Sequence, residues 1–217
     1  MSHQRIVFLG PPASGKGTAA QVVSAHCQVP HVSTGQMFRD AIRKGGPLSE
    51  VVRQFIDKGQ LVPDELTVQI VRLWLDDHGP DGGFIFDGFP RTLPQAEAFD
   101  RLLAERNLPL TLIILMEVKM EEILGRILGR LSCEKCGALY HAQNILPQQS
   151  GICDKCGGQL IRRHDDTAAI LHERMQWYET LTIPVVHHYE STGLLRRVNA
   201  SGLYERGFVD ILELLPV

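Results

Sequence analysis

The chain has 217 residues, of which 44% are apolar, so it can bury a sizeable core as one large domain with insertions or as two small domains. Its formal net charge of -3 at pH 7 provides no overall positive field that would attract nucleic acid or an anionic membrane. No apolar run approaches the ~20 residues of a membrane-spanning helix, and no signal pattern is present, so we expect a cytoplasmic protein.

Short β-branched runs alternate with helical patterns along the chain. The runs expected to form strands span residues 5–10, 83–88, 110–118 and 194–198. The helical patterns span residues 16–26, 94–105, 119–130, 166–189 and 201–214. Because the strand candidates are continuously apolar, they should be buried on both faces, as in a parallel sheet between layers of helices. The expected fold class is therefore α/β, with a doubly wound core.

Two segments do not follow this alternation. Residues 33–62 give two helical stretches with no convincing strand between them, and residues 131–167 form a turn-rich stretch with four of the five cysteines. Both are expected to be insertions at strand ends, where α/β sheets bind their ligands. The fifth cysteine, Cys27, ends the first helical pattern and is expected to be a packing residue.

The stretch GPPASGKGT at residues 10–18 follows the first apolar run and precedes the first helical pattern. It places Gly10, Gly15 and Lys16 at the spacing of a phosphate-binding loop. In such a loop, backbone N–H groups and the helix N-terminus hold phosphates, while the lysine adds a charge at the β and γ oxygens. Glycine is needed because a Cβ would block the close approach of the phosphate.

A magnesium ion is the expected companion of the bound phosphates. The hydroxyl usually assigned to this ion belongs to a Ser or Thr directly after the lysine. Here Gly17 occupies that position, and the hydroxyl of Thr18 lies one residue later. The ion should therefore be held largely through waters and the nucleotide itself. Asp87 ends the apolar run GFIFD and is expected to orient the hydrated Mg²⁺, although a turn-capping role is the alternative.

Two further motifs make the phosphate-binding class specific. STGQMFR at residues 33–39 and DGFPRTLPQ at residues 87–95, together with GPPASGKGT, resemble the adenylate kinase family in order and spacing across essentially the whole chain. The resemblance implies the reaction ATP + AMP ⇌ 2 ADP, catalysed by a monomer. It also implies a phosphate-loop kinase core with a five-stranded parallel sheet, a helical insertion that binds the nucleoside monophosphate, and a small lid that resembles a zinc ribbon.

The resemblance also implies domain boundaries and site residues. The core comprises residues 1–32, 63–129 and 168–217, the monophosphate-binding insertion residues 33–62, and the lid residues 130–167. The ATP-binding residues are Gly10, Ala13, Ser14, Gly15, Lys16, Gly17, Thr18, Arg126, Arg130, Leu139, Tyr140 and Gly202. The AMP-binding residues are Thr34, Arg39, Gln60, Leu61, Val62, Gly88, Phe89, Pro90, Arg91, Gln95, Arg163 and Arg174. The catalytic residues are Lys16, Asp87, Arg91, Arg130, Arg163 and Arg174.

These residue types suit phosphoryl transfer. The Gln95 amide can pair with both edge atoms of adenine, and Arg39 and Arg91 can each bind the monophosphate through two N–H groups. Such a group of arginines would repel itself without anions inside it, which is a mark of function. No general base is required for in-line transfer, so none of the nine histidines is assigned a catalytic role.

The chain departs from the family pattern at two positions. Ala13 stands where the family usually has glycine, so this position tests whether the loop needs a positive φ or only a small side chain. Gln36 stands where the family usually has aspartate, which removes a carboxylate that could pair with an arginine.

The cysteine spacing is that of a zinc ribbon. Cys133 and Cys136 form one C-x-x-C pair, Cys153 and Cys156 form the other, and a glycine follows each pair. Four thiolates complete a tetrahedral shell, so we expect a structural zinc ion with no position for an activated water. Iron or an unmetallated segment are the alternatives. His141 lies between the pairs but is not needed as a ligand.

Several other functions compete with adenylate kinase activity. A UMP/CMP kinase or a GMP kinase is the nearest alternative, and Thr34 with Gln95 favours adenine. A zinc-ribbon ATPase acting on nucleic acid is more distant, because residues 137–152 contain no lysine or arginine to neutralise phosphates. A non-catalytic nucleotide-binding module does not explain two complete sets of phosphate-binding arginines.

Overall fold

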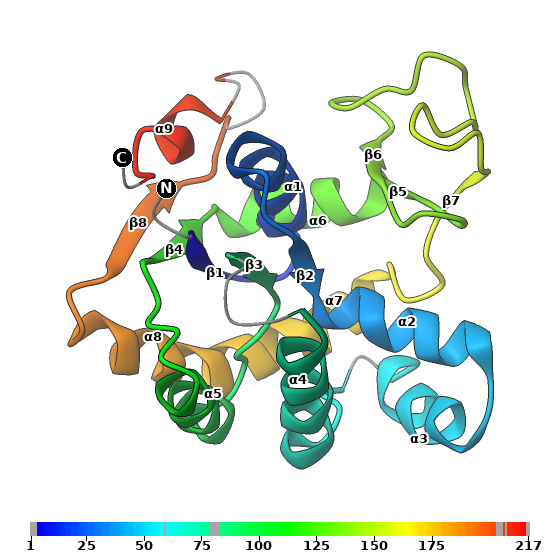
Figure 1. Cartoon of the computed structure of the whole chain (residues 1–217). Coiled ribbons are helices and arrows are strands. Elements are labelled where there is room, and N and C mark those ends of the chain that lie inside the picture. Colours follow the sequence, from blue (N-terminus) through cyan, green and yellow to red (C-terminus); the bar gives the residue numbers. More distant parts are fainter. Residues whose placement is uncertain (1–3, 59, 79–82, 203–205, 207, 216–217) are drawn as a thin grey trace.

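The computed structural model describes residues 4–58, 60–78, 83–202, 206 and 208–215. Its centre is a sheet of five parallel strands in the order β2-β3-β1-β4-β8 (Figure 1). The strands are β1 (Arg5–Leu9), β2 (His31–Ser33), β3 (Phe84–Asp87), β4 (Leu112–Glu117) and β8 (Leu195–Asn199). The three central strands are almost completely buried, which explains why their sequences are continuously apolar. The predicted α/β class with a five-stranded parallel sheet is confirmed.

Helices cover both faces of the sheet (Figure 1). Those on one face are α1 (Lys16–Cys27) and α9 (Val209–Leu212), and those on the other are α4 (Asp64–His78), α5 (Leu93–Glu105) and α8 (Ile183–Glu190). The second face has a core of aromatic rings, in which Phe86 and Phe99 meet edge to face with centroids 5.3 Å apart. Within the described ranges, no helix has both the length and the apolar character needed to cross a membrane.

Two outer parts are attached to this core. The helical insertion, residues 33–62, contains α2 (Thr34–Lys44) and α3 (Pro47–Ile56), which enclose a small core of Phe38, Val52 and Val62. The cysteine segment, residues 130–167, contains an antiparallel sheet in the order β6-β5-β7. Its strands are β5 (Arg130–Cys133), β6 (Leu139–His141) and β7 (Leu160–Ile161). Helices α6 (Met120–Leu128) and α7 (Ala168–Trp177) lead into and out of this segment and pack together through Ile127 and Leu171.

The structure differs from the expected elements in four places. Strand β2 and helix α4 were not predicted; β2 has only three residues, too few to show a pattern. The helix expected at residues 166–189 is divided into α7, a π-helical turn η1 (Tyr178–Thr182), and α8, in which Pro184 lacks the N–H that a continuous helix requires. The helix expected at residues 201–214 is seen only as α9; residues 203–205 and 207 lie outside the described residues.

Candidate active site

The phosphate-binding loop joins β1 to α1. Gly10 has a φ of 140°, and a Cβ at this position would lie 2.5 Å from the backbone oxygen of Met116 on β4, so only glycine fits. Gly15, with a φ of 96°, directly precedes α1. The turn therefore directs the N-terminus of α1, with its free N–H groups, toward the space beyond the ends of the strands.

Ala13 occupies the left-handed region, with a φ of 57°. The loop therefore requires a positive φ at this position and not only a small side chain. An L-residue with a Cβ is strained there by roughly 1–2 kcal/mol, which glycine avoids. The alanine at this position consequently costs stability.

Lys16 lies folded back onto the loop that precedes it. Its Nζ donates to the backbone oxygens of Gly10 at 2.8 Å and Pro11 at 2.7 Å. Burial, assisted by the charges of Arg91 and Arg130 and opposed by Asp87, lowers the pKa of Lys16 to about 8. An anion placed beside this ammonium group would reverse the shift.

Asp87 stands at the end of β3, next to the phosphate loop. Burial alone would raise its pKa, but the neighbouring His31, Lys16 and Arg91 outweigh burial and lower the pKa to about 2. The His31 Nε2 lies 3.7 Å from Oδ2 of this carboxylate. Asp87 is therefore ionised at neutral pH, and its oxygens have the chemistry that Mg²⁺ prefers.

One cavity of about 600 Å³ gathers nearly all of the predicted site residues. The predicted ATP-binding residues that line it are Gly10, Ala13, Ser14, Gly15, Lys16, Gly17, Thr18, Arg126, Arg130, Leu139 and Tyr140. The predicted AMP-binding residues that line it are Thr34, Arg39, Gln60, Leu61, Val62, Gly88, Pro90, Arg91, Gln95, Arg163 and Arg174. Asp87 lines it as well.

Two predicted residues are not in the lining of this cavity. The ring of Phe89 is fully buried in the aromatic core, 5.1 Å from the ring of Phe99 between centroids. Gly202 lies in the turn after β8, with a φ of 62°. This turn is linked to the site indirectly, because Arg126 donates both to the oxygen of Ala200 at 2.8 Å and to the oxygen of Ser14 at 3.0 Å.

Two neighbouring carboxylates at the C-terminal end of the cysteine segment bind two arginines. Asp166 accepts hydrogen bonds from Nε of Arg130 at 2.8 Å and from its Nη2, and Asp165 accepts from Nη2 of Arg174. Both carboxylate side chains are nearly fully buried. Neither carboxylate was predicted to be functional, although the motif RRHDD places two acids after two arginines with only His164 between them.

Two other arginines of the cavity, Arg91 and Arg163, hydrogen-bond to neutral oxygen atoms. Arg163 donates to the hydroxyl of Ser132 at 3.4 Å, and Arg91 donates through Nε to the oxygen of Gly88 at 2.7 Å. Burial and the charges of neighbouring arginines lower the pKa of Arg163 to about 9 and that of Arg91 to about 10. Guanidinium groups remain protonated at neutral pH, so these shifts indicate unfavourable crowding of positive charge that anions would relieve.

Gln36 partly replaces the carboxylate that the family pattern leads one to expect. Its Oε1 accepts hydrogen bonds from Nη2 of Arg39 at 3.0 Å and Nε at 3.3 Å, and its Nε2 donates to Asp40 at 2.9 Å. The amide therefore holds Arg39 without neutralising its charge.

At the insertion end of the cavity, Thr34 and Gln95 are both 2% exposed. The Thr34 hydroxyl donates to the oxygen of Gly88 at 3.0 Å. The Gln95 amide accepts from the N–H of Arg91 at 2.8 Å and donates to Asp64 at 2.7 Å. These bonds fix the orientation of the amide, and they leave its second N–H and second lone pair for a ligand. Asp64, which sets this orientation, was not predicted from the sequence.

The helical insertion and the cysteine segment touch each other across the cavity. Nη1 of Arg43 on α2 donates to the backbone oxygen of Glu134 at 2.9 Å. On the other side, Nε2 of His164 lies 2.9 Å from Oδ1 of Asp57. The cavity is thus covered by two parts of the chain that are attached to the core separately.

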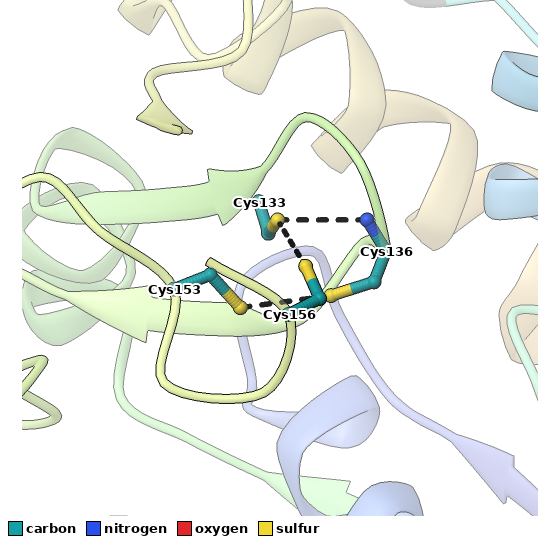
Figure 2. Close-up of side chains that lie close together, drawn as sticks. All are labelled: Cys133, Cys136, Cys153 and Cys156. Atoms are coloured by element: carbon teal, nitrogen blue, oxygen red, sulfur yellow. Dashed lines mark hydrogen bonds between the residues drawn. The ribbon is translucent and has the colours of Figure 1, made fainter. Parts of the chain in front are cut away.

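The four cysteines of the cysteine segment converge on one another (Figure 2). The Sγ atoms of Cys133 and Cys156 are 3.5 Å apart, those of Cys136 and Cys153 are 3.6 Å apart, and all four lie within 4.8 Å of one another. Tetrahedral zinc with Zn–S bonds near 2.3 Å requires S···S separations of about 3.8 Å. The cysteines are therefore positioned to bind a metal ion. His141 is not part of this group, because its Nδ1 accepts from the N–H groups that follow it.

One ligand is prepared for metal binding by its surroundings. Burial acts to raise the pKa of Cys153, but hydrogen bonds from the Tyr140 hydroxyl and from the N–H groups of Lys155 and Cys156 outweigh burial and lower the pKa to about 6. Cys27, by contrast, packs against the α1 side of the core, and burial raises its pKa, in agreement with the expected packing role.

Comparison with known proteins identifies relatives over almost the whole chain. A model of the adenylate kinase family matches residues 8–194. An adenylate kinase of Clostridium botulinum (strain Hall) is 43% identical over 211 residues, covering 97% of this chain and 98% of the relative. Adenylate kinases of Geobacillus sp. (strain WCH70) and Carboxydothermus hydrogenoformans are 42% and 40% identical, and the alignments cover 97% of this chain in both cases and 97% and 99% of the relatives.

The strained conformation of Ala13 leads to a prediction. Ala13→Gly should stabilise the protein by about 0.5–1 kcal/mol, because relief of the left-handed strain exceeds the added entropy of the unfolded chain. The matched control, Ala98→Gly within α5, should destabilise it by about 1 kcal/mol. Urea unfolding of both variants measures these changes, and a destabilising Ala13→Gly would contradict the strain.

Proposed function

The chain belongs to the adenylate kinase family, and on this premise we propose that it transfers a phosphoryl group from MgATP to AMP, forming two molecules of ADP. The observation that carries the proposal is that the lining of one cavity combines a phosphate-binding loop, a buried amide and several arginines. Two nucleotides meeting phosphate to phosphate would satisfy all three features.

Each part of the cavity has a role in this reaction. We assign the ATP phosphates to the loop at residues 10–18, with Arg126 and Arg130 beside them. We assign AMP to the side that carries Arg39, Arg91 and Gln95. An AMP phosphate oxygen attacks the γ-phosphorus in line, the bond from that phosphorus to the β,γ-bridging oxygen breaks, and ADP departs with the electron pair.

The protein supplies orientation and positive charge. Lys16, released from the loop oxygens that it binds in this structure, would neutralise charge on the transferred group. Arg163 and Arg174, on either side of Asp165, would contact the phosphates of both substrates. None of these roles moves a proton from carbon or water, so the reaction needs no general base.

Asp87 and Thr18 fit a role in holding hydrated magnesium, which would neutralise negative charge on the phosphates when bound. The support is the ionised state of Asp87 and the presence of both residues in the cavity lining. The four-cysteine group fits structural zinc, because its sulfur separations match tetrahedral coordination and no ligand position remains for water.

We also propose the division into a core, a monophosphate-binding insertion at 33–62 and a lid at 130–167. In support, the insertion and the lid each have a small core of their own and touch each other over the cavity. Opening of these contacts would admit substrates, and closing would exclude water. We propose a monomer, as the family resemblance implies. We also propose that the protein does not act on nucleic acid, because residues 137–152 lack lysine and arginine.

A direct assay tests the reaction. With Mg²⁺, the protein should convert ADP into equal amounts of ATP and AMP, and the reverse reaction should prefer AMP to UMP, CMP and GMP. Lys16→Ala should lower kcat by about 10²-fold or more, because transition-state charge loses a buried cation. The control Lys119→Ala removes an exposed lysine and should retain normal turnover. Activity with UMP or GMP in place of AMP would contradict the proposed substrate.

A second experiment tests the metal. Elemental analysis should give about one zinc per chain. Cys153→Ser should lose the metal and, at a cost of about 3 kcal/mol, lower Tm by about 6–12 °C. Cys27→Ser, in the core, provides the control and should retain the metal. A metal-free wild-type protein with the same Tm as the metal-loaded form would contradict a structural role.

A further inference from the structure

The hydroxyl of Tyr140 connects one metal ligand to strand β6. It donates to Sγ of Cys153 across 3.6 Å and accepts the N–H of Asp154 at 2.8 Å. The side chain is 7% exposed and belongs to the small core of the cysteine segment, together with Cys133 and Cys153. The hydroxyl thus lies at the metal site without being a ligand.

The direction of the O–H bond follows from these contacts. A tyrosine hydroxyl has a single hydrogen, and the N–H of Asp154 already occupies one of its lone pairs. The hydrogen is therefore free to point at sulfur. An O–H···S bond to a coordinated thiolate fixes the orientation of the ligand, and loss of such a supporting contact commonly weakens metal binding 10–100-fold.

The neighbours of Tyr140 on β6 face the opposite side of the strand. Alternation along a strand places Leu139 and His141 together on the other face. There, a Cβ added to Gly17 would lie 2.9 Å from Cδ1 of Leu139, so this leucine rests against the phosphate-binding loop. His141 also lines the cavity. One three-residue strand therefore contacts the four-cysteine group through Tyr140 and lines the nucleotide cavity with all three of its residues.

We propose that Tyr140 is a positioning residue that orients Cys153 in the metal site and, through β6, holds Leu139 against the phosphate loop. The metal then does more than hold the lid together, because it also fixes the surface that the lid presents to ATP. The effect on the metal is independent of the proposed kinase function, whereas the effect on ATP rests on that function.

The test compares Tyr140→Phe with Tyr189→Phe. The control also removes a buried hydroxyl, but one that donates to Asp100 at 3.0 Å, outside the cysteine segment. Zinc-loaded protein is mixed with a chromogenic chelator. The affinity of Tyr140→Phe for zinc should be about 10–100-fold lower than that of the wild type, and the affinity of Tyr189→Phe should match the wild type. Equal zinc retention in Tyr140→Phe and wild type would overturn the proposal.

Two further measurements distinguish loss of the specific contact between Tyr140 and Cys153 from a general loss of stability in the cysteine segment. In cobalt-loaded Tyr140→Phe, the thiolate-to-metal charge-transfer band should move to longer wavelength, because sulfur without the O–H···S bond donates electrons more easily. An unchanged band would contradict the contact with Cys153. In the kinase assay of Tyr140→Phe, KM for ATP should rise several-fold relative to KM for AMP. An unchanged KM for ATP would overturn the link through β6.

Discussion

The gathering of buried positive charge around one cavity is the constraint on which the rest of this structure depends. Lys16, Arg91 and Arg163 come from three different parts of the chain, and burial together with repulsion from neighbouring arginines lowers the pKa of each. Asp165 and Asp166 offset part of this charge. The remainder favours the entry of phosphate groups, so the feature that costs folding energy in the free protein also provides affinity for nucleotides.

The outer parts of the molecule follow from this constraint. A cationic cavity that must both admit nucleotides and exclude water needs covers that move, and such covers are too small to bury much apolar surface. The helical insertion solves this with a core around Phe38, and the cysteine segment with four converging thiols and Tyr140. Arg43 joins the two covers by binding a backbone oxygen between the first two cysteines, at Glu134. The four-cysteine group therefore also supports a contact that closes the cavity.

The sequence could predict the residues of the site better than the contacts that hold those residues in place. Gly10, Lys16 and the cysteines were recognisable because their spacing alone determines their chemistry. Asp64 and Asp166 were not, because their role depends on which side chain they meet in space. The φ of Ala13 was an open question that only the folded backbone answers. Strand β2 could not be predicted because its three residues are too few to show a periodic hydrophobic pattern. The π-helical turn before α8 depends on local packing around a proline.

Proton uptake on nucleotide binding tests most directly whether the buried cationic groups of this cavity bind phosphate. With its pKa lowered to about 8, Lys16 is largely neutral at about pH 8.5 in the free protein, and bound phosphate would restore its proton. Calorimetry of MgATP binding in buffers of different ionisation enthalpy should therefore show uptake of most of a proton at this pH, and far less at about pH 7. Lys16→Met should abolish the difference. Equal proton exchange at both pH values in the wild-type protein would contradict the account.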